Sequence, residues 1–471
     1  MTRIRSFARI AAVMTIVAAL AVPSFAARGS ADFTRFVAIG DSYGAGFEAG
    51  SLNQNHQPFG WPAIIARQVG LQICPPTAAA TDNCFAIPFI SNPGLPGGEL
   101  VFNGSTLVTV PGSGVPLMLG FQRPYNNLSV PGYTVGAVQA LTGAEPTSGL
   151  GQVILRGLGT EVDQALALHP TFIAIWIGGN DFLGAVSAGD PTKLTPPATF
   201  AAQYKAMLDK LTAGAPNAGM VMGTLPASFA APPLTSRLPA FVFDPNFQPV
   251  TSPLINNGAP IPLFYIPAGT TTPAPVPPGS IFLLSSLARY QQGFGIPPQL
   301  KGVPPFSLLP HTGEPLTDAE IITPAEQKIF SDTITAYNAT ITAEATARNI
   351  PLADIKGLFD RLTQPQVFGG VALTNTWISG GIFSNDGVHL TDIGYTLFAN
   401  EYIKAINSGY NTDIPLASIA ATFQNNGQFT GFGDNKGYVI VSPDAAAAMT
   451  SIFNGVEVPV PAPPRRRGAG H

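Results

Sequence analysis

The chain has 471 residues, enough for one large domain with insertions or for two domains, and 45% of them are hydrophobic. Only 11% of the residues are charged and the net charge is −4, so we expect no nucleic-acid partner. Glycine (50) and proline (47) together form about a fifth of the chain, below the roughly 25–30% typical of disordered chains. We therefore expect a folded protein with many long loops.

The N-terminus is typical of a secretory signal peptide. Three arginines within the first nine residues precede an apolar run at 10–22, and small residues follow around Ala26. We predict that residues 1–26 are removed by cleavage after Ala26 and that the protein is secreted or periplasmic. The run has 13 residues, fewer than the roughly 20 that span a bilayer. No later segment reads as a membrane helix, so we expect no transmembrane segment after cleavage.

The first strand predicted after the signal peptide is residues 36–40, a short apolar run that ends in glycine. A sharp turn follows it and places Ser42 at the carboxyl end of the strand, where open α/β sheets bind their ligands. A helix is expected at about 61–69, because proline lies near its start and glycine just past its end.

Residues 74–128 are rich in proline, glycine, asparagine and serine, and we predict a loop-rich insertion with a hairpin strand at 106–110. Cys74 and Cys84 are the only cysteines, with nine residues between them. In an oxidising compartment we expect them to form a disulfide. A metal site is the other interpretation, but two cysteines without Cys-x-x-Cys spacing offer too few ligands.

Apolar strands then alternate with amphipathic helices. Strands are predicted at 171–177, 219–223 and 350–355, and helices at 159–168, after Pro196-Pro197, after the capping box Thr323-Pro324-Ala325-Glu326, and after Thr391. This alternation predicts an α/β domain with a mostly parallel sheet.

The main domain is expected at 27–410, and a second insertion, of hairpins and turns, occupies about 225–320. Residues 411–471 look like a separate C-terminal extension with a short Ala-rich helix near 444–453. We find no internal repeat.

A hydrolytic serine needs a base, a group that orients the base, and donors for the developing oxyanion. The chain has five histidines. His471 ends the chain, and His169 precedes a proline where we expect a helix cap. His56 and His311 lie in polar loops without an acidic neighbour at a useful spacing.

His389 is the remaining candidate base, because it follows Asp386 by three residues in the loop before a helix. That spacing lets one turn of backbone bring a carboxylate to the far nitrogen of the imidazole, where it fixes the tautomer and stabilises the imidazolium. The other interpretation of Asp-Gly-Val-His is a turn beside a helix cap.

Two further segments offer donors for an oxyanion. Asn180 follows Gly178-Gly179 at the end of a predicted strand, where its amide N–H could point at a reacting oxygen. Gly132, after Pro131, could supply a backbone N–H. Both segments are also compatible with simple turns.

Taken in order, these blocks resemble the SGNH/GDSL hydrolase family. The resemblance rests on Gly40-Asp41-Ser42, on Gly132 in Asn-x-x-x-Pro-Gly, on Gly178-x-Asn180-Asp181 and on Asp386-x-x-His389. It covers about residues 33–410, outside the two insertions. One departure is Tyr43, where the short name of the family has Leu.

The resemblance implies a flavodoxin-like three-layer α/β/α sandwich and ester hydrolysis without a cofactor or a metal. Ser42 would be the nucleophile, His389 the general base and then acid, and Asp386 the group that orients His389. The N–H of Ser42, the N–H of Gly132 and the side-chain amide of Asn180 would form the oxyanion hole.

Residues 40–44 also match Gly-x-Ser-x-Gly, the nucleophile elbow of α/β-hydrolases. That fold needs strands before the elbow, but Ser42 follows the first predicted strand. The acid also lies three residues from the histidine, and no His-Gly-Gly oxyanion motif occurs. We therefore disfavour the α/β-hydrolase fold.

The sequence predicts an exported serine esterase or lipase that acts on a small-molecule, lipid or glycan ester. An acyltransferase or a carbohydrate O-deacetylase could use the same residues. A non-catalytic surface-binding protein is the alternative from another class.

Overall fold

The computed structural model describes residues 27–425 and 440–441. Within the first range, the description leaves out residues 104–105, 227–235, 240, 243–248, 254, 284–285, 287–288, 291, 301–311, 369–370 and 378–379. The predicted signal peptide and the predicted helix near 444–453 lie outside the described residues.

A four-stranded parallel sheet forms the centre of the molecule, in the order β1-β4-β5-β14. Its strands are β1 (Phe36–Gly40), β4 (Phe172–Trp176), β5 (Gly219–Gly223) and β14 (Leu352–Ala353). Every residue of the first three strands is buried, because helices cover both faces. All four strands lie within the predicted ranges, although β14 has only two residues.

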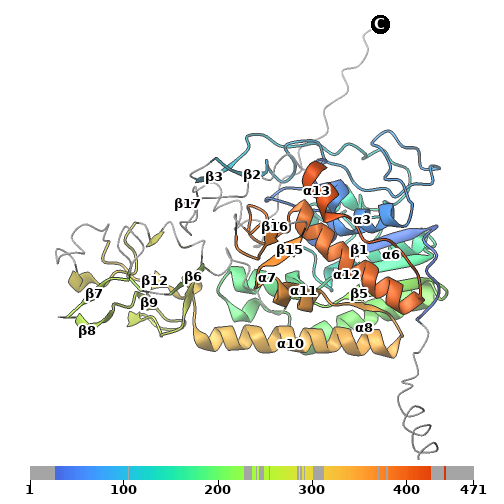
Figure 1. Ribbon diagram of the computed structural model, residues 1–471. Helices are drawn as coiled ribbons and strands as arrows, with labels where there is room; N and C mark the ends of the chain where they lie inside the picture. The colour runs from blue at the N-terminus through green and yellow to red at the C-terminus, as the bar shows by residue number, and fades with distance from the viewer. Residues whose placement is uncertain are drawn as a thin grey trace, which may run out of the picture.

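Helices cover both faces of this sheet (Figure 1). On one face, α3 (Trp61–Gln68) packs against α12 (Asp392–Tyr410). On the other face lie α6 (Glu161–Ala167) and α8 (Pro197–Gly214), and α8 packs against the long helix α10 (Pro324–Ala347). The predicted α/β sandwich with three layers is confirmed. We call the four-stranded sheet and the helices that cover it the sheet unit.

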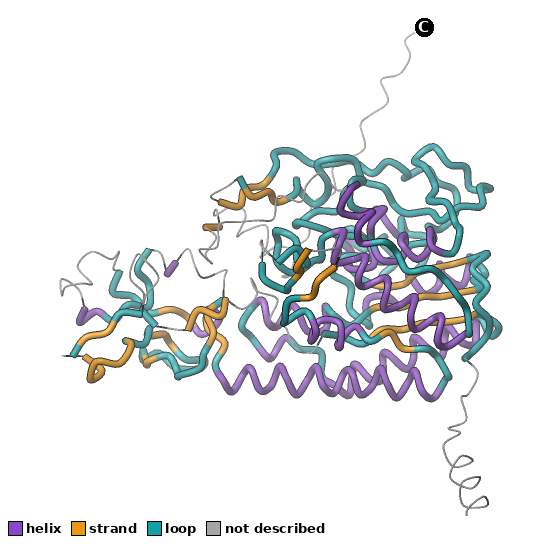
Figure 2. Tube along the Cα trace, in the orientation of Figure 1, coloured by secondary structure: helices purple, strands orange, loops and turns teal. Residues whose placement is uncertain are grey.

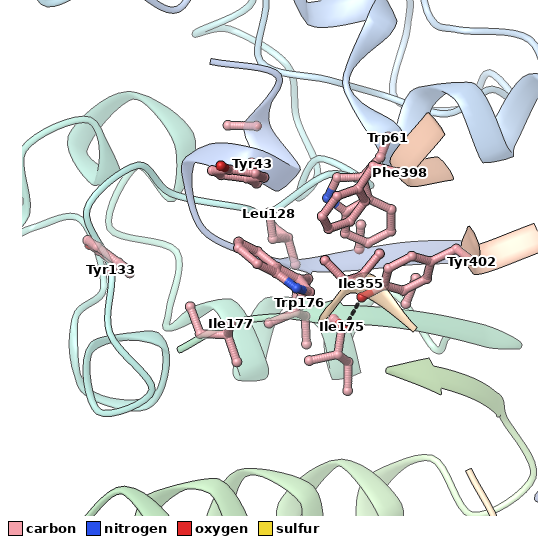
Figure 3. Packing of buried hydrophobic residues seen from close by; sticks show 14 of the residues in the cluster. Tyr43, Trp61, Leu128, Tyr133, Ile175, Trp176, Ile177, Ile355, Phe398 and Tyr402 are labelled. Atoms are coloured by element: carbon pink, nitrogen blue, oxygen red, sulfur yellow. Dashed lines mark hydrogen bonds between the residues drawn. The ribbon is translucent and has the colours of Figure 1, made fainter. Parts of the chain in front are cut away.

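Aromatic rings fill the layer between the sheet and α12 (Figure 3). The Trp61 and Tyr402 rings stack with their centroids 4.5 Å apart, and the Tyr402 hydroxyl donates to the carbonyl of Ile175 in β4 (2.8 Å). Tyr43 lies over Trp176, with 4.7 Å between ring centroids. Helix α12 is therefore fixed to the strand ends by packing and by a hydrogen bond.

The predicted helix caps are present. The Thr323 N–H donates to the Glu326 carboxylate (2.7 Å), and the Glu326 N–H donates back to the Thr323 hydroxyl (3.3 Å), which completes the capping box of α10. The Thr391 hydroxyl accepts from the Gly394 N–H (3.1 Å) and caps α12.

An extended segment, residues 126–130, lies along the outer edge of β1. The Ala38 N–H donates to the Asn126 carbonyl (2.8 Å), and the N–H groups of Leu128 and Val130 donate to the carbonyls of Ala38 and Gly40 (3.0 and 3.1 Å). The segment therefore runs parallel to β1, and the residues that follow it emerge at the carboxyl end of that strand.

The first insertion contains β2 (Leu100–Phe102) paired antiparallel with β3 (Thr106–Thr109), close to the predicted hairpin strand. Cys74 and Cys84 form the predicted disulfide, with 5.1 Å between their Cα atoms. Cys74 is fully buried in the main core and Cys84 packs against it, so the bridge closes a short loop whose base lies on that core.

The described part of the second insertion contains short strands: β6 (Ser236–Pro239), β7 (Thr251–Ser252), β8 (Ile255–Pro260), β9 (Phe264–Ile266), β10 (Ala274–Pro275), β11 (Ile281–Phe282) and β12 (Leu316–Thr317). They gather beside the N-terminal end of α10, to the left of the sheet unit (Figure 2). Their buried side chains form a second core, which also includes Ala49, Leu100 and Leu107.

The remaining elements are short. They include α2 (Ser42–Ala45), the 3₁₀ turn η1 (Gln57–Phe59), α4 (Ala137–Ala140), α5 (Gly151–Ile154), α7 (Asn180–Ser187), β13 (Ile321–Ile322), α11 (Ile355–Arg361), β15 (Gln366–Phe368), β16 (Val371–Leu373), α13 (Ile419–Asn425) and β17 (Ile440–Val441).

The start of the C-terminal extension packs on α12. The hydroxyls of Thr396 and Thr422 lie 3.1 Å apart, and the Asn400 amide donates to the Ala417 carbonyl (3.1 Å). Strand β17 pairs with β3. Within the described part of the chain, no helix combines the length and apolarity needed to cross a membrane.

Candidate active site

Ser42 lies just beyond the carboxyl end of β1, as the first residue of the one-turn helix α2. Asp41 caps this helix, because its carboxylate accepts from the Tyr43 N–H (3.1 Å). The chain leaves α2 through Gly46, whose φ of 74° is in the left-handed region that favours glycine. The Asp41 cap and the Gly46 turn thus fix the backbone that carries Ser42 at both ends. Ser42 itself is only 5% exposed.

Gly44 allows segment 126–130 to approach α2 closely. A Cβ atom at Gly44 would lie 2.1 Å from the Ser129 hydroxyl oxygen, so a larger residue would push the two segments apart. The Asn127 amide also donates to the Gly44 carbonyl (2.7 Å). This contact fixes the loop that leads to Gly132 relative to the helix that carries Ser42.

Asp386 and His389 form a buried pair in the loop before α12. The carboxylate of Asp386 lies 2.8 Å from His389 Nδ1, and the residues are 0% and 1% exposed. An ionised carboxylate only accepts hydrogen bonds, so the proton of the neutral ring lies on Nδ1 and Nε2 carries the lone pair. Nε2 is therefore the basic atom of the pair.

Further donors hold Asp386 in its ionised form. The N–H groups of Gly50, Val388 and His389 donate to its carboxylate (2.7, 2.9 and 2.8 Å), and so does the Ser384 hydroxyl (3.1 Å). Burial alone would raise the pKa of Asp386, but the His389 imidazole and these N–H groups outweigh it and lower the pKa to about 2.

Neighbouring residues join the segment that carries Ser42 to the loop that carries His389. The Tyr43 hydroxyl donates to the Val388 carbonyl (2.6 Å), and the Phe47 ring lies 4.6 Å from the imidazole, centroid to centroid. The Phe47 N–H donates to the Ser42 carbonyl (3.1 Å). The hydrogen bonds of the described residues do not include one from the Ser42 hydroxyl to His389. In unliganded enzymes this contact is often long, and it tightens when substrate binds.

The three predicted oxyanion donors come from three elements that meet at the end of β1. Gly132 is exposed, with a φ of 84°, and follows segment 126–130. Asn180 begins α7, and its amide donates to the Tyr133 carbonyl (3.0 Å). That bond uses one of two amide hydrogens. Within the described part of the chain, the N–H groups of Ser42 and Gly132 donate to no protein acceptor.

The sequence model of the family described as "GDSL-like Lipase/Acylhydrolase" matches residues 36–254. Over these residues the chain belongs to this family. The match begins at β1 and includes Ser42, Gly132 and Asn180.

Three solved structures resemble this GDSL-family chain at low identity: a GDSL-like lipase from Parabacteroides merdae ATCC 43184 (13% identity, 79% of this chain and 96% of that chain, TM-score 0.32), a family 3 carbohydrate esterase from Clostridium thermocellum (12%, 79% and 96%, 0.30), and phospholipase A1 from Streptomyces albidoflavus NA297 (13%, 81% and 100%, 0.29). Such TM-scores support no argument about this protein's substrate. No curated protein matches the chain.

Buried carboxyl groups surround β1 in this GDSL-family chain. Burial raises the pKa of Asp41 well above its usual value, with a smaller contribution from the charge of Asp181. Burial likewise raises the pKa of Glu161, whose carboxylate accepts from the Gly40 N–H (3.1 Å), and raises that of Asp181 to about 6. Burial thus shifts these three groups toward the protonated form relative to an exposed carboxyl, whereas the surroundings of Asp386 favour its ionised form.

The structure corrects the interpretation of His56, which has acidic neighbours in space although none at a useful spacing in the sequence. Its ring is buried among the carboxylates of Glu48, Glu99 and Asp392. His169 follows α6 with a φ of 49°, where a helix end was predicted. His311 and His471 lie outside the described residues.

Two contributors to the site were not predicted. The Ser384 hydroxyl accepts from the Ala49 N–H (3.0 Å) and donates to Asp386, and the Tyr43 hydroxyl joins α2 to the loop of His389. A serine two residues before an aspartate is a weak signal for such a turn. Nothing local to Tyr43 indicates a partner 345 residues away.

Proposed function

We propose that this GDSL-family protein is a serine hydrolase that cleaves carboxylic esters through Ser42, His389 and Asp386. The Asp386–His389 pair carries this proposal, since a buried carboxylate held ionised beside Nδ1 prepares Nε2 to act as a base. The rings of Tyr43 and Phe47 beside His389 support its placement next to the nucleophile.

In this mechanism the Ser42 oxygen attacks the ester carbonyl carbon while His389 Nε2 takes the serine proton. The negative charge develops on the carbonyl oxygen, which accepts from the N–H groups of Ser42 and Gly132 and from the Asn180 amide. The tetrahedral intermediate collapses, the alcohol leaves with the proton from His389, and an acyl-serine forms. Water, activated by His389, then releases the carboxylic acid.

The test is hydrolysis of a short p-nitrophenyl ester by the Ser42→Ala variant. We expect kcat to fall about 10⁴-fold or more, with the urea unfolding midpoint unchanged. Ser129→Ala is the matched control, because Ser129 is also a buried serine next to α2 and its hydroxyl has no hydrogen-bond partner among the residues that the structure describes. Wild-type turnover by Ser42→Ala would refute the mechanism.

Labelling with a fluorophosphonate probe separates the enzyme from a non-catalytic binding protein. We expect one adduct, on Ser42, and its absence from the wild-type protein would favour the binding protein. Product analysis with sugar acceptors and with acetylated glycans separates hydrolysis from acyl transfer and from carbohydrate deacetylation. A series of esters of increasing acyl length then defines the substrate class.

We also propose that the protein is exported and that cleavage occurs after Ala26. The disulfide between Cys74 and Cys84 supports an oxidising compartment, because such bonds are rare in the cytosol. Mass spectrometry of the protein secreted by its host should find an N-terminus at Ala27. An intact N-terminus on cytosolic protein would contradict this proposal.

A further inference from the structure

His56 lies at a point where three segments distant in the sequence meet. The residue precedes η1 and is only 4% exposed. Glu48 reaches it from the loop after α2, Glu99 from the first insertion, and Asp392 from the first turn of α12. Three carboxylates around one buried imidazole are an uncommon arrangement, because charged groups are seldom buried without strong partners.

Two of these carboxylates face the same ring nitrogen. His56 Nδ1 lies 3.3 Å from Glu48 Oε2 and 3.2 Å from Asp392 Oδ1, and the three atoms all lie within 4.8 Å of one another. Ligand atoms that bind one tetrahedral ion at about 2.0–2.2 Å are about 3.3–3.6 Å apart. The spacing from Nδ1 to both oxygens therefore suits a shared ion.

The other ring nitrogen has the partner that a metal-bound histidine usually has. His56 Nε2 lies 3.3 Å from Glu99 Oε2, and the Asn53 amide donates to the same oxygen (3.0 Å). With an ion bound at Nδ1, the carboxylate at Nε2 would hold the ring proton there and leave the Nδ1 lone pair to the ion.

Glu48 supplies an independent observation. Its Oε2 atom is buried and, among the described residues, has no hydrogen bond of good geometry, although His56 Nδ1 lies 3.3 Å away. The residue is only 7% exposed. A cation shared with His56 Nδ1 would satisfy this oxygen.

We propose that Glu48, His56 and Asp392 bind one divalent transition-metal ion of the Zn²⁺ type, with Glu99 as the positioning residue behind His56. One imidazole nitrogen and two carboxylate oxygens suit such an ion. Glu48 follows Ser42 by six residues, and Asp392 follows His389 by three. The ion would thus tie the segment of the proposed nucleophile to that of the proposed base. It touches no reacting atom, and the site does not depend on the ester hydrolysis proposed above.

The test is Zn²⁺ binding by the full chain after dialysis against EDTA and then against metal-free buffer. Calorimetric titration should give one equivalent of Zn²⁺ per chain, and Zn²⁺ should raise the thermal unfolding midpoint. In Glu48→Gln we expect at least 10- to 100-fold weaker binding and no rise in the midpoint. Because that variant could fail to fold, Glu99→Gln provides a second one, with about 10-fold weaker binding.

Glu161→Gln is the matched control. Glu161 is fully buried, and within the described ranges its Oε1 also lacks a hydrogen-bond partner and no histidine pairs with its carboxylate. Its affinity for Zn²⁺ should equal that of the wild-type protein, and circular dichroism should show that all three variants are folded. The proposal is overturned if the wild-type protein gives no saturable Zn²⁺ binding, or if folded Glu48→Gln binds Zn²⁺ as tightly as the wild-type protein does.

Discussion

The sheet unit and the second core differ in how their buried apolar residues are arranged along the chain. In the sheet unit, β1, β4 and β5 are fully buried five-residue strands, and long helices cover them. In the second core, strands of two to six residues form several small sheets, and their apolar residues come from between positions 49 and 321. The sheet unit therefore follows from the regular spacing of apolar residues in its strands and helices. The second core instead depends on contacts between loops.

The candidate active site lies where these two parts meet. The Ala49 N–H donates to Ser384, and the Asn385 amide donates to the carbonyl of Leu100, a residue of the second core (2.9 Å). On the other side, Tyr43 joins the Asp386–His389 loop to the sheet unit. This contrast predicts that changes to the loop of Asp386 and His389 affect turnover. Changes to the main core or to the second core should affect mainly the stability of that core.

The largest expected effect is that of Asp386→Asn. An amide at this position leaves His389 in the wrong tautomer, so we expect kcat for a p-nitrophenyl ester to fall about 10⁴-fold. Asp360→Asn is the control, because Asp360 is exposed and pairs only with Lys356 on the surface. If Asp386→Asn lowers stability but leaves kcat near the wild-type value, the loop merely joins the two parts.

Phe172→Ala should have the next largest effect. Phe172 is fully buried in β4 and packs against Phe33 and Tyr410, with ring centroids 4.4 and 5.5 Å away. Its removal leaves a cavity in the main core and should lower the free energy of unfolding by about 3–5 kcal/mol. Urea unfolding measures this loss, and a change below about 1 kcal/mol would mean that the sheet unit is not the stable part.

Phe282→Ala makes a cavity in the second core, where Phe282 is 3% exposed. We expect faster hydrogen exchange across residues 261–322 and unchanged protection of β1, β4 and β5, since the second core is a separate cluster. Mass spectrometry of exchanged peptides measures both. Equal loss of protection in the three sheet strands would show that the two parts unfold as one.

Replacing both cysteines, Cys74→Ser with Cys84→Ser, should cost about 2–3 kcal/mol of unfolding free energy, because it opens a short closed loop. The cost should appear in the sheet unit, where Cys74 is buried. Thermal unfolding of the variant, beside wild-type protein in dithiothreitol, measures it. A variant as stable as the oxidised wild-type protein would exclude this contribution.

The smallest expected effect is a pH dependence from Asp181, which belongs to the sheet unit. Its pKa is raised by burial from 3.8 to about 6, so between these values the folded state binds more protons than the unfolded state. Stability therefore falls as the pH rises through this range, by about 2 kcal/mol from this group, and stays lower above it. Asp181→Asn should remove this part of the decline in urea unfolding between pH 4 and 7. A variant with the wild-type slope would contradict the assignment.

Much of the sheet unit could be predicted from local patterns. Continuous apolar runs indicated the strands, and the Thr323 and Thr391 caps indicated where α10 and α12 begin. The second core offered no such period, because strands such as β7 and β10 have only two residues. Their positions depend on partners that no local pattern reveals.

The residues of the site also include some that local patterns could predict and some that they could not. Asp386 and His389 are three residues apart, and their pairing could be predicted from that spacing. His56 could not be interpreted correctly, since Asp392 lies 336 residues and Glu99 lies 43 residues along the chain. The catalytic roles of Ser42, Gly132 and Asn180 remain predictions for the experiments above.

The Tyr43 hydroxyl has a consequence for redesign by consensus. Replacing Tyr43 with leucine would restore the four letters of the family's name, yet it would remove the donor that the Val388 carbonyl receives at 2.6 Å. The exchange would loosen helix α2, which carries Ser42, from the loop of His389. A design that follows the average sequence at this position would thus make the chain more typical of its family and would weaken the contact that aligns these two segments.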